Sequence, residues 1–382
     1  MEQQYNIIIA GAGGIAEAAA LMLLEWSPVP PSLFIGNRTL EKAKKMVQWL
    51  QGGTTGPTKL TAFHLPESDL SEEMKQVLQQ GDLLLDCLPG SEAPRLAGLA
   101  KDYNLHYANL TEYVSETNEI ISLAEGAKTG FLLQTGIAPG YINVLANGLF
   151  QKFCAQNEVD KVDKLEMRVG ALTDHAVAPH YYGFTWSPVG VATEYLKRAE
   201  VLRDFKKRNV AALSERKRIL INGIAYEEDL TSGGAANLPD ALAGKVRELD
   251  YKTLRHPGHF EWVERQLLGM GGTEDMIAEL QKRMELVIPN IEEDQIILYV
   301  AVEGRDAKGI LRRHEIARKI LPQTVGKHRL RAIQTTTAAP LLQSAQLLLE
   351  TSPKGVIHQS EIDPETFLNG NFVVKVYGEV GL

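Results

Sequence analysis

The stretch NIIIAGAGGIA, residues 6–16, decides how the chain begins to fold. Its first half is a short run of apolar and β-branched residues, which predicts a buried strand. Its second half matches the pattern G-x-G-x-x-G/A, and the Ala-rich segment that follows predicts a helix. A strand, a glycine-rich turn and a helix in this order are typical of the phosphate-binding start of a dinucleotide-binding fold.

Each small residue of the turn has a physical reason in such a fold. Gly11 permits the tight turn, Gly13 lets the backbone approach a pyrophosphate, and Ala16 allows close packing of helix on strand. The helix start supplies N–H groups and a favourable dipole for an anion. We therefore expect Gly11, Gly13, Gly14 and Ile15 to bind a dinucleotide. The alternative is a glycine-rich turn that holds no ligand.

Strand and helix patterns alternate through the first 140 or so residues. This order predicts βαβ units and a Rossmann-type, doubly wound parallel sheet. The strands are expected at residues 6–10, 33–35, 83–87, 106–108 and 131–134, and the helices at 15–26, 40–50, 94–102 and 118–128. The fold class predicted for this part of the chain is therefore α/β.

A second α/β domain with a mixed sheet is expected further along the chain. From about residue 160, longer segments rich in β-branched and aromatic residues occur, such as 164–169 and 295–303. Residues 337–350 predict a helix with Pro340 in its first turn, where a missing N–H costs little. The basic but mixed-charge run 197–218 is interpreted as a solvated helix face.

Composition excludes several classes of function. The 382 residues with 44% hydrophobic content favour two domains, and the net charge of −8 gives no surface suited to nucleic acid. The two cysteines, Cys87 and Cys154, have no spacing typical of a metal site or a disulfide framework. The start of the chain resembles no signal peptide, and no apolar run is long enough to span a bilayer. We expect a soluble, cytoplasmic protein with no metal and with no membrane or nucleic-acid partner.

The end of the second strand bears on the choice of dinucleotide. Asn37, Arg38 and Thr39 stand where an NAD site would carry an acidic residue for the ribose. The guanidinium of Arg38 can pair with a 2′-phosphate, and its two neighbours can add hydrogen bonds. These residues therefore predict NADP rather than NAD. NAD stays an alternative, because Arg38 could be a solvated loop residue and Glu41 is near enough to bind a ribose.

Five ordered motifs resemble those of the saccharopine dehydrogenase family. They are LLLDCLPG (83–90), HYANLTEY (106–113), TGIAPGYINVLA (135–146), FTWSP (184–188) and TLRHPGHFE (253–261). The combination of FTWSP, TLRHPGH and the APG form of the segment at 135–146 is most similar to the branch that contains lysine 6-dehydrogenase. The family also includes saccharopine reductases and carboxynorspermidine dehydrogenases.

This resemblance implies an NAD(P)-dependent oxidoreductase that acts on a C–N bond of a small amino acid or amine, as in lysine metabolism. It implies that Cys87, Leu88 and Pro89 contact the nicotinamide half of the cofactor and that Pro139 belongs to the segment closing the cofactor domain. It further implies a dinucleotide-binding domain at 1–140, completed by 336–382, and a substrate-binding and dimerisation domain at 141–335. A homodimer is therefore expected.

The family motifs of the second domain also supply candidate substrate residues. Arg255 offers a fork for an α-carboxylate, although it could instead be a structural, paired arginine. His259 titrates near neutral pH and is the candidate for proton transfer, although a histidine is more often satisfied by backbone. Trp186 and Ser187 could wall the substrate and hydrogen-bond to it, whereas a Trp at such a place is commonly core.

The last candidates follow the strand at 106–108, at the usual ligand edge of an open α/β sheet. Thr111 and Glu112 are expected there, with Glu112 accepting a proton or holding an ammonium group unless it is simply an exposed carboxylate. Asn109 is counted with the substrate residues, and it stands where many relatives carry Asp. That difference leaves open a cofactor-binding sensor or pseudoenzyme without turnover. Within the enzyme class, the alternative is an NAD-dependent lysine 6-dehydrogenase.

Overall fold

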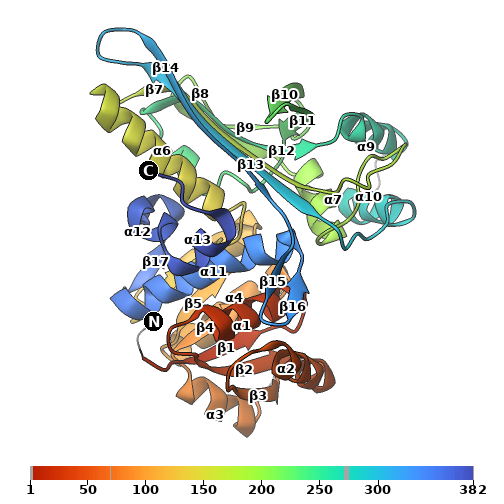
Figure 1. Ribbon diagram of the computed structural model, residues 1–382, viewed down its shortest axis with the longest axis vertical. Helices are drawn as coiled ribbons and strands as arrows, with labels where there is room; N and C mark the ends of the chain where they lie inside the picture. Colours follow the sequence, from red (N-terminus) through yellow and green to blue (C-terminus); the bar gives the residue numbers. More distant parts are fainter. Residues whose placement is uncertain (1–2, 69, 271–274, 382) are drawn as a thin grey trace. The chain divides into compact units, whose positions relative to one another are not determined.

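The computed structural model describes residues 3–68, 70–270 and 275–381 (Figure 1). The chain forms two compact units. Unit 1 consists of Met1–Tyr141, Gln323–Leu330 and Gln334–Glu379, and unit 2 of Ile142–Pro322, Arg331–Ile333 and Val380–Leu382. The chain thus leaves unit 1 after Tyr141, builds most of unit 2, and returns to unit 1 at Gln323.

Unit 1 is built on a seven-stranded parallel sheet in the order β17-β6-β5-β4-β1-β2-β3 (Figure 1). The strands are β1 (Asn6–Ala10), β2 (Ser32–Asn37), β3 (Lys59–His64), β4 (Leu83–Asp86), β5 (His106–Asn109), β6 (Gly130–Leu132) and β17 (Gly355–Ile357). The order reverses at β1, which lies between β4 and β2, and open α/β sheets usually bind ligands at the carboxyl ends of the strands beside such a reversal. The predicted Rossmann-type sheet is confirmed, while β3 and β17 were missed.

Helices connect and cover these strands, as buried parallel strands require. They are α1 (Gly14–Trp26), α2 (Leu40–Gly53), α3 (Glu72–Gln80), α4 (Ala93–Asp102), α5 (Val114–Leu123), α12 (Pro364–Leu368) and α13 (Asn371–Tyr377), with short 3-10 turns η1 (Gly90–Glu92) and η2 (Gln359–Glu361). The helix expected at 118–128 begins and ends earlier, as α5. A two-stranded sheet of β15 (Gln323–Val325) and β16 (His328–Leu330) also belongs to unit 1.

The predicted position of Pro340 in a first turn is wrong. Helix α11 runs from Ala332 to Thr351, so Pro340 lies inside it. The early start depends on a distant carboxylate, because Asp294 accepts hydrogen bonds from the backbone N–H of Ala332 and of Ile333, both at 2.7 Å. A cap that comes from another part of the chain leaves no signal in the local sequence.

Unit 2 contains a mixed sheet of eight strands, as expected for the second domain. Its main path is β10-β11-β12-β7-β13-β14, with β8 pairing β12 and β9. Strand β12 is parallel to β7, and the other pairs are antiparallel. The strands are β7 (Val162–Leu172), β8 (Ala199–Arg203), β9 (Lys206–Val210), β10 (Lys217–Ile221), β11 (Ile224–Leu230), β12 (Val246–Arg255), β13 (Gln295–Arg305) and β14 (Leu311–Ile320). The helices are α6 (Tyr141–Asn157), α7 (Pro188–Leu196), α8 (Leu238–Ala241), α9 (His259–Leu268) and α10 (Met276–Glu285).

The interpretation of residues 197–218 as a solvated helix is wrong. This run forms β8, β9 and the start of β10. Val201 and Leu202 are fully buried in β8, and Leu202 pairs with Leu249 of β12. Pairing with a strand that lies more than 40 residues away overrides the local charge pattern.

Candidate functional site

The glycine-rich turn joins β1 to α1 at the carboxyl edge of the unit 1 sheet. Gly11 has a φ of +118°, and a Cβ there would lie 3.0 Å from the carbonyl oxygen of Cys87. Its N–H donates to the carbonyl of Gly36 at 2.8 Å. Both the backbone angle and the close approach therefore require glycine at position 11.

The next part of the turn is open. Gly13 is exposed and extended, with a φ of −101°, and no heavy atom of the described chain lies within 4 Å of the place its Cβ would take. It is the N-cap residue of α1, and Gly14 begins the helix. The backbone there can meet a pyrophosphate without steric hindrance, and the helix start favours an anion. The residues of the turn thus fit a dinucleotide.

Arg38 lies at the end of β2 and forms an ion pair with Glu67, a partner that the sequence did not suggest. The two side chains are 74% and 57% exposed, so the pair contributes little to stability and a phosphate can displace Glu67. Asn37 accepts a hydrogen bond from the backbone N–H of Thr39 at 2.9 Å, and Glu41 binds Lys44 at 2.8 Å. The guanidinium of Arg38 therefore lies where a 2′-phosphate would bind, and the carboxylate of Glu67 would compete with that phosphate for Arg38.

The loop after β4 begins with a buried carboxyl group. Asp86 is 2% exposed, and burial raises its pKa to about 7. Cys87 and Leu88 are half-buried and Pro89 is exposed, so the loop rises from the core to the surface. Burial also raises the pKa of the Cys87 thiol, which stays neutral. A Cβ on Gly90 would lie 2.4 Å from the hydroxyl oxygen of Thr111, which brings the loops after β4 and β5 together.

Asn109 ends β5 and is fully buried. Its amide donates to the hydroxyl of Tyr107 at 3.4 Å and accepts from the backbone N–H of Gln134 at 2.9 Å. Its carbonyl accepts from both the backbone N–H and the hydroxyl of Thr135, at 2.9 and 2.7 Å. These bonds join β5 to the segment after β6, and they favour a structural role over direct contact with a substrate.

Thr111, Glu112 and Pro139 complete the predicted residues of unit 1. Thr111 is buried and accepts a hydrogen bond from the backbone N–H of Tyr113 at 3.3 Å, and Pro139 is buried as well. Glu112 is half-buried, and burial raises the pKa of its carboxyl group. A raised carboxyl pKa suits a group that exchanges protons near neutral pH. Glu112 therefore stays the acid–base candidate of this edge.

In unit 2, Arg255 is buried, and each of its three side-chain nitrogens donates a hydrogen bond within the protein. Its Nε donates to the hydroxyl of Tyr195 at 2.6 Å, and its two terminal nitrogens donate to Glu194 at 3.1 Å and to the carbonyl of Leu254 at 3.0 Å. The guanidinium also lies 4.7 Å from the centre of the Tyr182 ring. This arrangement favours the alternative of a structural, paired arginine over a fork for the substrate.

His259 is fully buried at the start of α9. Its Nδ1 lies 2.6 Å from the carbonyl oxygen of His180, and its Nε2 lies 3.0 Å from the hydroxyl of Tyr195. A carbonyl can only accept, so Nδ1 carries the proton and Nε2 accepts from Tyr195. Burial and the charge of Arg255 lower the pKa of His259 well below its usual value. The imidazole is therefore neutral and held in one tautomer, which favours a role satisfied by the protein itself.

Trp186 and Ser187 shape the start of α7. Ser187 caps this helix by accepting a hydrogen bond from the backbone N–H of Gly190 at 3.3 Å. A Cβ on Gly190 would lie 2.4 Å from the Trp186 ring, so the ring packs directly on the first turn. Trp186 is half-buried and Ser187 is exposed, which leaves both able to meet a ligand.

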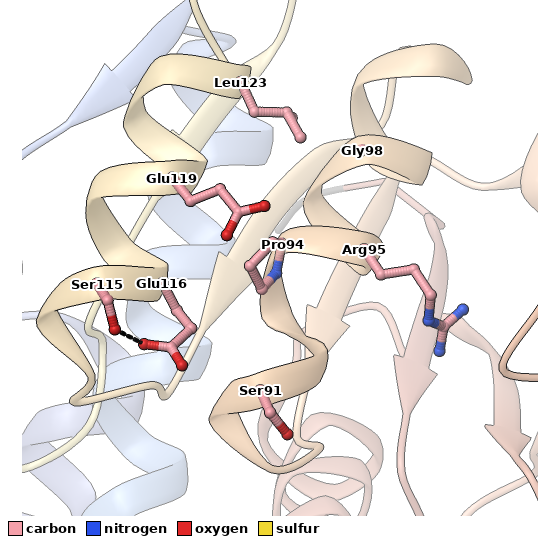
Figure 2. A pocket seen from close by; sticks show the side chains of 8 residues that line it. All are labelled: Ser91, Pro94, Arg95, Gly98, Ser115, Glu116, Glu119 and Leu123. Atoms are coloured by element: carbon pink, nitrogen blue, oxygen red, sulfur yellow. Dashed lines mark hydrogen bonds between the residues drawn. The ribbon is translucent and has the colours of Figure 1, made fainter.

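An open groove lies between α4 and α5, with a volume of about 600 Å³ (Figure 2). It is lined by Ser91, Pro94, Arg95, Gly98, Ser115, Glu116, Glu119 and Leu123. Figure 2 shows Glu116 and Glu119 projecting from α5, opposite Pro94 of α4. The predicted site residues are absent from this lining.

Among residues 3–68, 70–270 and 275–381, no group of three or more His, Cys, Asp or Glu side chains is placed to hold a metal ion. Within the same described ranges, no helix combines the length and apolar character that crossing a membrane requires.

Sequence reasoning missed two buried clusters. One contains Asp86 and Tyr107 in unit 1, and the other contains Glu194 and Tyr195 in unit 2. A signal for the first was present, because Asp86 directly follows three leucines in an otherwise apolar strand. A carboxyl group at such a place is rarely left without a partner.

The parallel sheet, the reversal at β1 and the glycine-rich turn together define a dinucleotide-binding fold of the Rossmann type. A comparison with family models supports this class. Residues 7–132 match the saccharopine dehydrogenase NADP binding domain, and residues 136–370 match the saccharopine dehydrogenase C-terminal domain. The chain therefore belongs to the saccharopine dehydrogenase family, as its motifs predicted. The match of residues 7–132 to the NADP binding domain confirms the prediction of NADP, with NAD as the alternative.

Solved structures and a curated relative agree with the fold. Apo saccharopine dehydrogenase (L-Glu forming) from Saccharomyces cerevisiae is similar with a TM-score of 0.73 and 16% identity, over 97% of this chain and 96% of that one. Homospermidine synthase from Legionella pneumophila, solved with NAD, is similar with a TM-score of 0.70 and 14% identity, over 99% and 91%. Shikimate dehydrogenase (NADP(+)) from Methanobrevibacter smithii is 28% identical over 128 residues, which span 33% of this chain and only 42% of that relative.

Proposed function

We propose that the protein catalyses NADP-dependent hydride exchange at a carbon bearing nitrogen, in a small amino acid or amine. The observation that carries this proposal is the open turn at Gly13, which lies inside the segment that matches the family's NADP-binding domain. The names of the two similar structures support the substrate class, since one concerns saccharopine and the other homospermidine. Lysine-like and polyamine-like compounds are therefore the first substrates to test.

When bound, NADP supplies the hydride donor or acceptor. The chain's own residues have separate tasks in this proposal. Gly11, Gly13 and the start of α1 bind the pyrophosphate, and Arg38 binds the 2′-phosphate in place of Glu67. Glu112 exchanges a proton with the substrate nitrogen or with water, which its raised carboxyl pKa permits.

Unit 2 is the substrate-binding and dimerisation part in this proposal. Trp186 and Ser187 are the predicted residues there that remain accessible to a substrate. Arg255 and His259 are assigned a positioning role, because both hold Tyr195 and Arg255 also holds Glu194. The substrate-binding assignment of Trp186 and Ser187 rests on the family motif FTWSP, which contains them.

An NAD-dependent lysine 6-dehydrogenase is the second candidate, and Glu67 is the observation that favours it. Glu67 follows β3, which pairs with β2, and a carboxylate beside the end of β2 can accept hydrogen bonds from ribose hydroxyls and would repel a 2′-phosphate. Glu67 is near enough to bind Arg38, and its side chain is 57% exposed. The relative affinity for NADPH and NADH therefore separates the two candidates.

The test is fluorescence titration of the full chain with NADPH and NADH, followed by turnover on lysine, saccharopine, diaminopimelate and carboxynorspermidine. Tighter NADPH binding and turnover of one substrate would support the proposal. Cofactor binding with no turnover across the panel would instead favour a sensor. If neither cofactor binds, the assignment of the glycine-rich turn fails and the proposed function fails with it.

A matched pair of variants tests the turn itself. Neither Gly13 nor Gly52 has any described heavy atom within 4 Å of its missing Cβ, so Gly13→Ala and Gly52→Ala should both fold. The first methyl group occupies the approach to the pyrophosphate, and the second lies in α2. We expect Gly13→Ala to weaken NADPH binding about tenfold or more and Gly52→Ala to leave it unchanged. Equal affinities in the two variants would contradict the assignment.

A further inference from the structure

A network of buried, hydrogen-bonded polar groups crosses three neighbouring strands at the carboxyl edge of the unit 1 sheet. The hydroxyl of Tyr107 lies 2.8 Å from Oδ2 of Asp86, and the amide of Asn109 donates to that hydroxyl at 3.4 Å. Asn109 then accepts from the backbone N–H of Gln134, whose carbonyl accepts from the amide of Gln359 at 2.7 Å. All five side chains are at most 9% exposed. The network therefore links the ends of β4, β5 and β6 to the C-terminal segment.

The two ends of this network hold two backbone segments in place. Oδ1 of Asp86 accepts from the backbone N–H of Leu88 at 3.0 Å and so fixes the loop after β4. At the other end, Gln134 has a φ of +60°, which is strained for a residue with a side chain. Strain of this kind persists only where neighbours over-determine the backbone, and here Asn109 and Gln359 do so.

The hydrogen bonds around Tyr107 can be satisfied both when Asp86 is ionised and when it is protonated. When Asp86 is ionised, the phenol donates to its Oδ2 at 2.8 Å. When Asp86 is protonated, its hydroxyl can donate to the phenol oxygen, and the phenol can turn its proton to the carbonyl of Ala93 at 3.2 Å. Asn109 donates to the phenol oxygen in both states. Neither state leaves a buried polar group without a partner, so the cost of changing between them is low.

Charged and titratable groups reach Asp86 from several elements. Tyr107 faces it from β5, and the Arg95–Glu92 ion pair, at 2.9 Å, acts on it from η1 and α4. Cys87 adjoins it in sequence as a neutral thiol, and β1 contributes Ala10, which has no charge. Burial is the largest influence and raises the pKa of Asp86 to about 7. Asp86 can therefore change charge within the range in which enzymes usually work.

The position of Asp86 in the sheet relates this charge to the cofactor. The adenosine ribose of a dinucleotide lies at the end of β2, and the ligand crosses the reversal at β1, so its other half lies on the β4 side. Asp86 ends β4. The oxidised nicotinamide ring carries a positive charge that the reduced ring lacks, and a buried carboxylate nearby is only weakly screened.

We propose that Asp86 and Tyr107 are positioning residues that hold a proton beneath the loop after β4, and that loss of this proton favours oxidised over reduced cofactor. The inference rests on the proposed binding of NADP to unit 1. It assigns no contact with substrate to either residue. The phenol keeps the carboxyl group in place, and the charge of that group acts at the carboxyl end of β4.

The test measures the dissociation constants of NADPH and NADP⁺ from the full chain between about pH 6 and about pH 8. Titration of the 2′-phosphate is common to both forms and cancels in the ratio of the two constants. In the wild type we expect the ratio to move about fivefold toward NADP⁺ as the pH rises, a size usual for coupled sites. In Asp86→Asn, which imitates the protonated state, we expect a constant ratio. Asp82→Asn changes an exposed carboxylate at the opposite end of the same strand and should behave as the wild type.

Tyr107→Phe gives an independent measurement that does not depend on folding of the Asp86 variant. It keeps the ring that contacts Phe131 and removes the hydroxyl that stabilises the carboxylate, so the midpoint of the pH change should move upward. A wild-type ratio that is constant with pH, or an unchanged midpoint in Tyr107→Phe, would overturn the inference while the proposed function stands. If the wild type binds neither form of the cofactor, both are overturned.

Discussion

Replacing Asp86 with Asn should change how the stability of the cofactor-free protein depends on pH. Asn keeps the shape of the side chain, can accept from the Leu88 N–H, and can donate to the Tyr107 oxygen. It cannot ionise. The difference in the free energy of unfolding between wild type and variant therefore isolates the titration of this one carboxyl group, because all other groups titrate in both proteins.

The magnitude follows from the pKa. Burial raises the pKa of Asp86 from 3.8 to about 7, and each pKa unit corresponds to about 1.4 kcal/mol. Because the folded-state value lies above the unfolded one, the favourable contribution is complete below 3.8 and is lost as the pH rises through about 7. The total is about 4 kcal/mol, of which about 3 kcal/mol develops between about pH 5 and about pH 8. Between about pH 5 and about pH 8, the free energy of unfolding of Asp86→Asn should therefore rise by about 3 kcal/mol relative to that of the wild type.

Urea unfolding at a series of pH values measures the difference. Asp363→Asn is a control of opposite sign, because hydrogen bonds from Thr366 lower the pKa of Asp363, so its contribution is present at high pH and lost as the pH falls. That variant should therefore lose stability relative to the wild type as the pH rises. A difference between wild type and Asp86→Asn that does not vary with pH would refute the reasoning, since Asp86 would then titrate alike in folded and unfolded chains.

Four further substitutions have defined outcomes. Asn109→Asp should lower stability by about 3–5 kcal/mol near pH 7.5, because it buries an unpaired carboxylate, and urea unfolding should show partial recovery toward pH 5. Arg255→Ala should lower the free energy of unfolding by about 3–5 kcal/mol, since it breaks a buried ion pair with Glu194. A raised KM at unchanged stability would instead indicate that Arg255 binds the substrate. Arg38→Ala should weaken NADPH binding more than NADH binding in fluorescence titrations, and Glu67→Gln should strengthen NADPH; equal effects on both cofactors would remove Arg38 from the 2′-phosphate.

The predictable part of the fold is the part coded by neighbouring residues. The turn at Gly11 could be predicted because the tight backbone and the strand before it lie within ten residues. The strand β8 could not, because its burial depends on pairing with β12, far along the chain. The start of α11 could not either, because its cap is Asp294, which lies 38 residues before Ala332.

The same distinction applies to the candidate site. Arg38 was identified from its place after a strand, but its pairing with Glu67 joins residues 29 positions apart. The fork expected of Arg255 was inferred from residue type, whereas its donors are engaged by Tyr195 and Glu194, about 60 positions away. Residue type indicates what a side chain can bind. The fold decides which partners are already bound.

Strand β17 has a consequence for how the protein is made. It adds to β6 with residues 355–357, so the parallel sheet that begins at Asn6 is finished only near the end of the chain. Residues 142–322 are in effect an insertion within unit 1. During synthesis, the glycine-rich turn emerges before residues 142–322, yet the unit that contains it lacks its edge strand until the insertion has been translated. Pairing across more than 200 residues is slow, so the nucleotide-binding unit should become native after unit 2 even though its other strands are synthesised earlier.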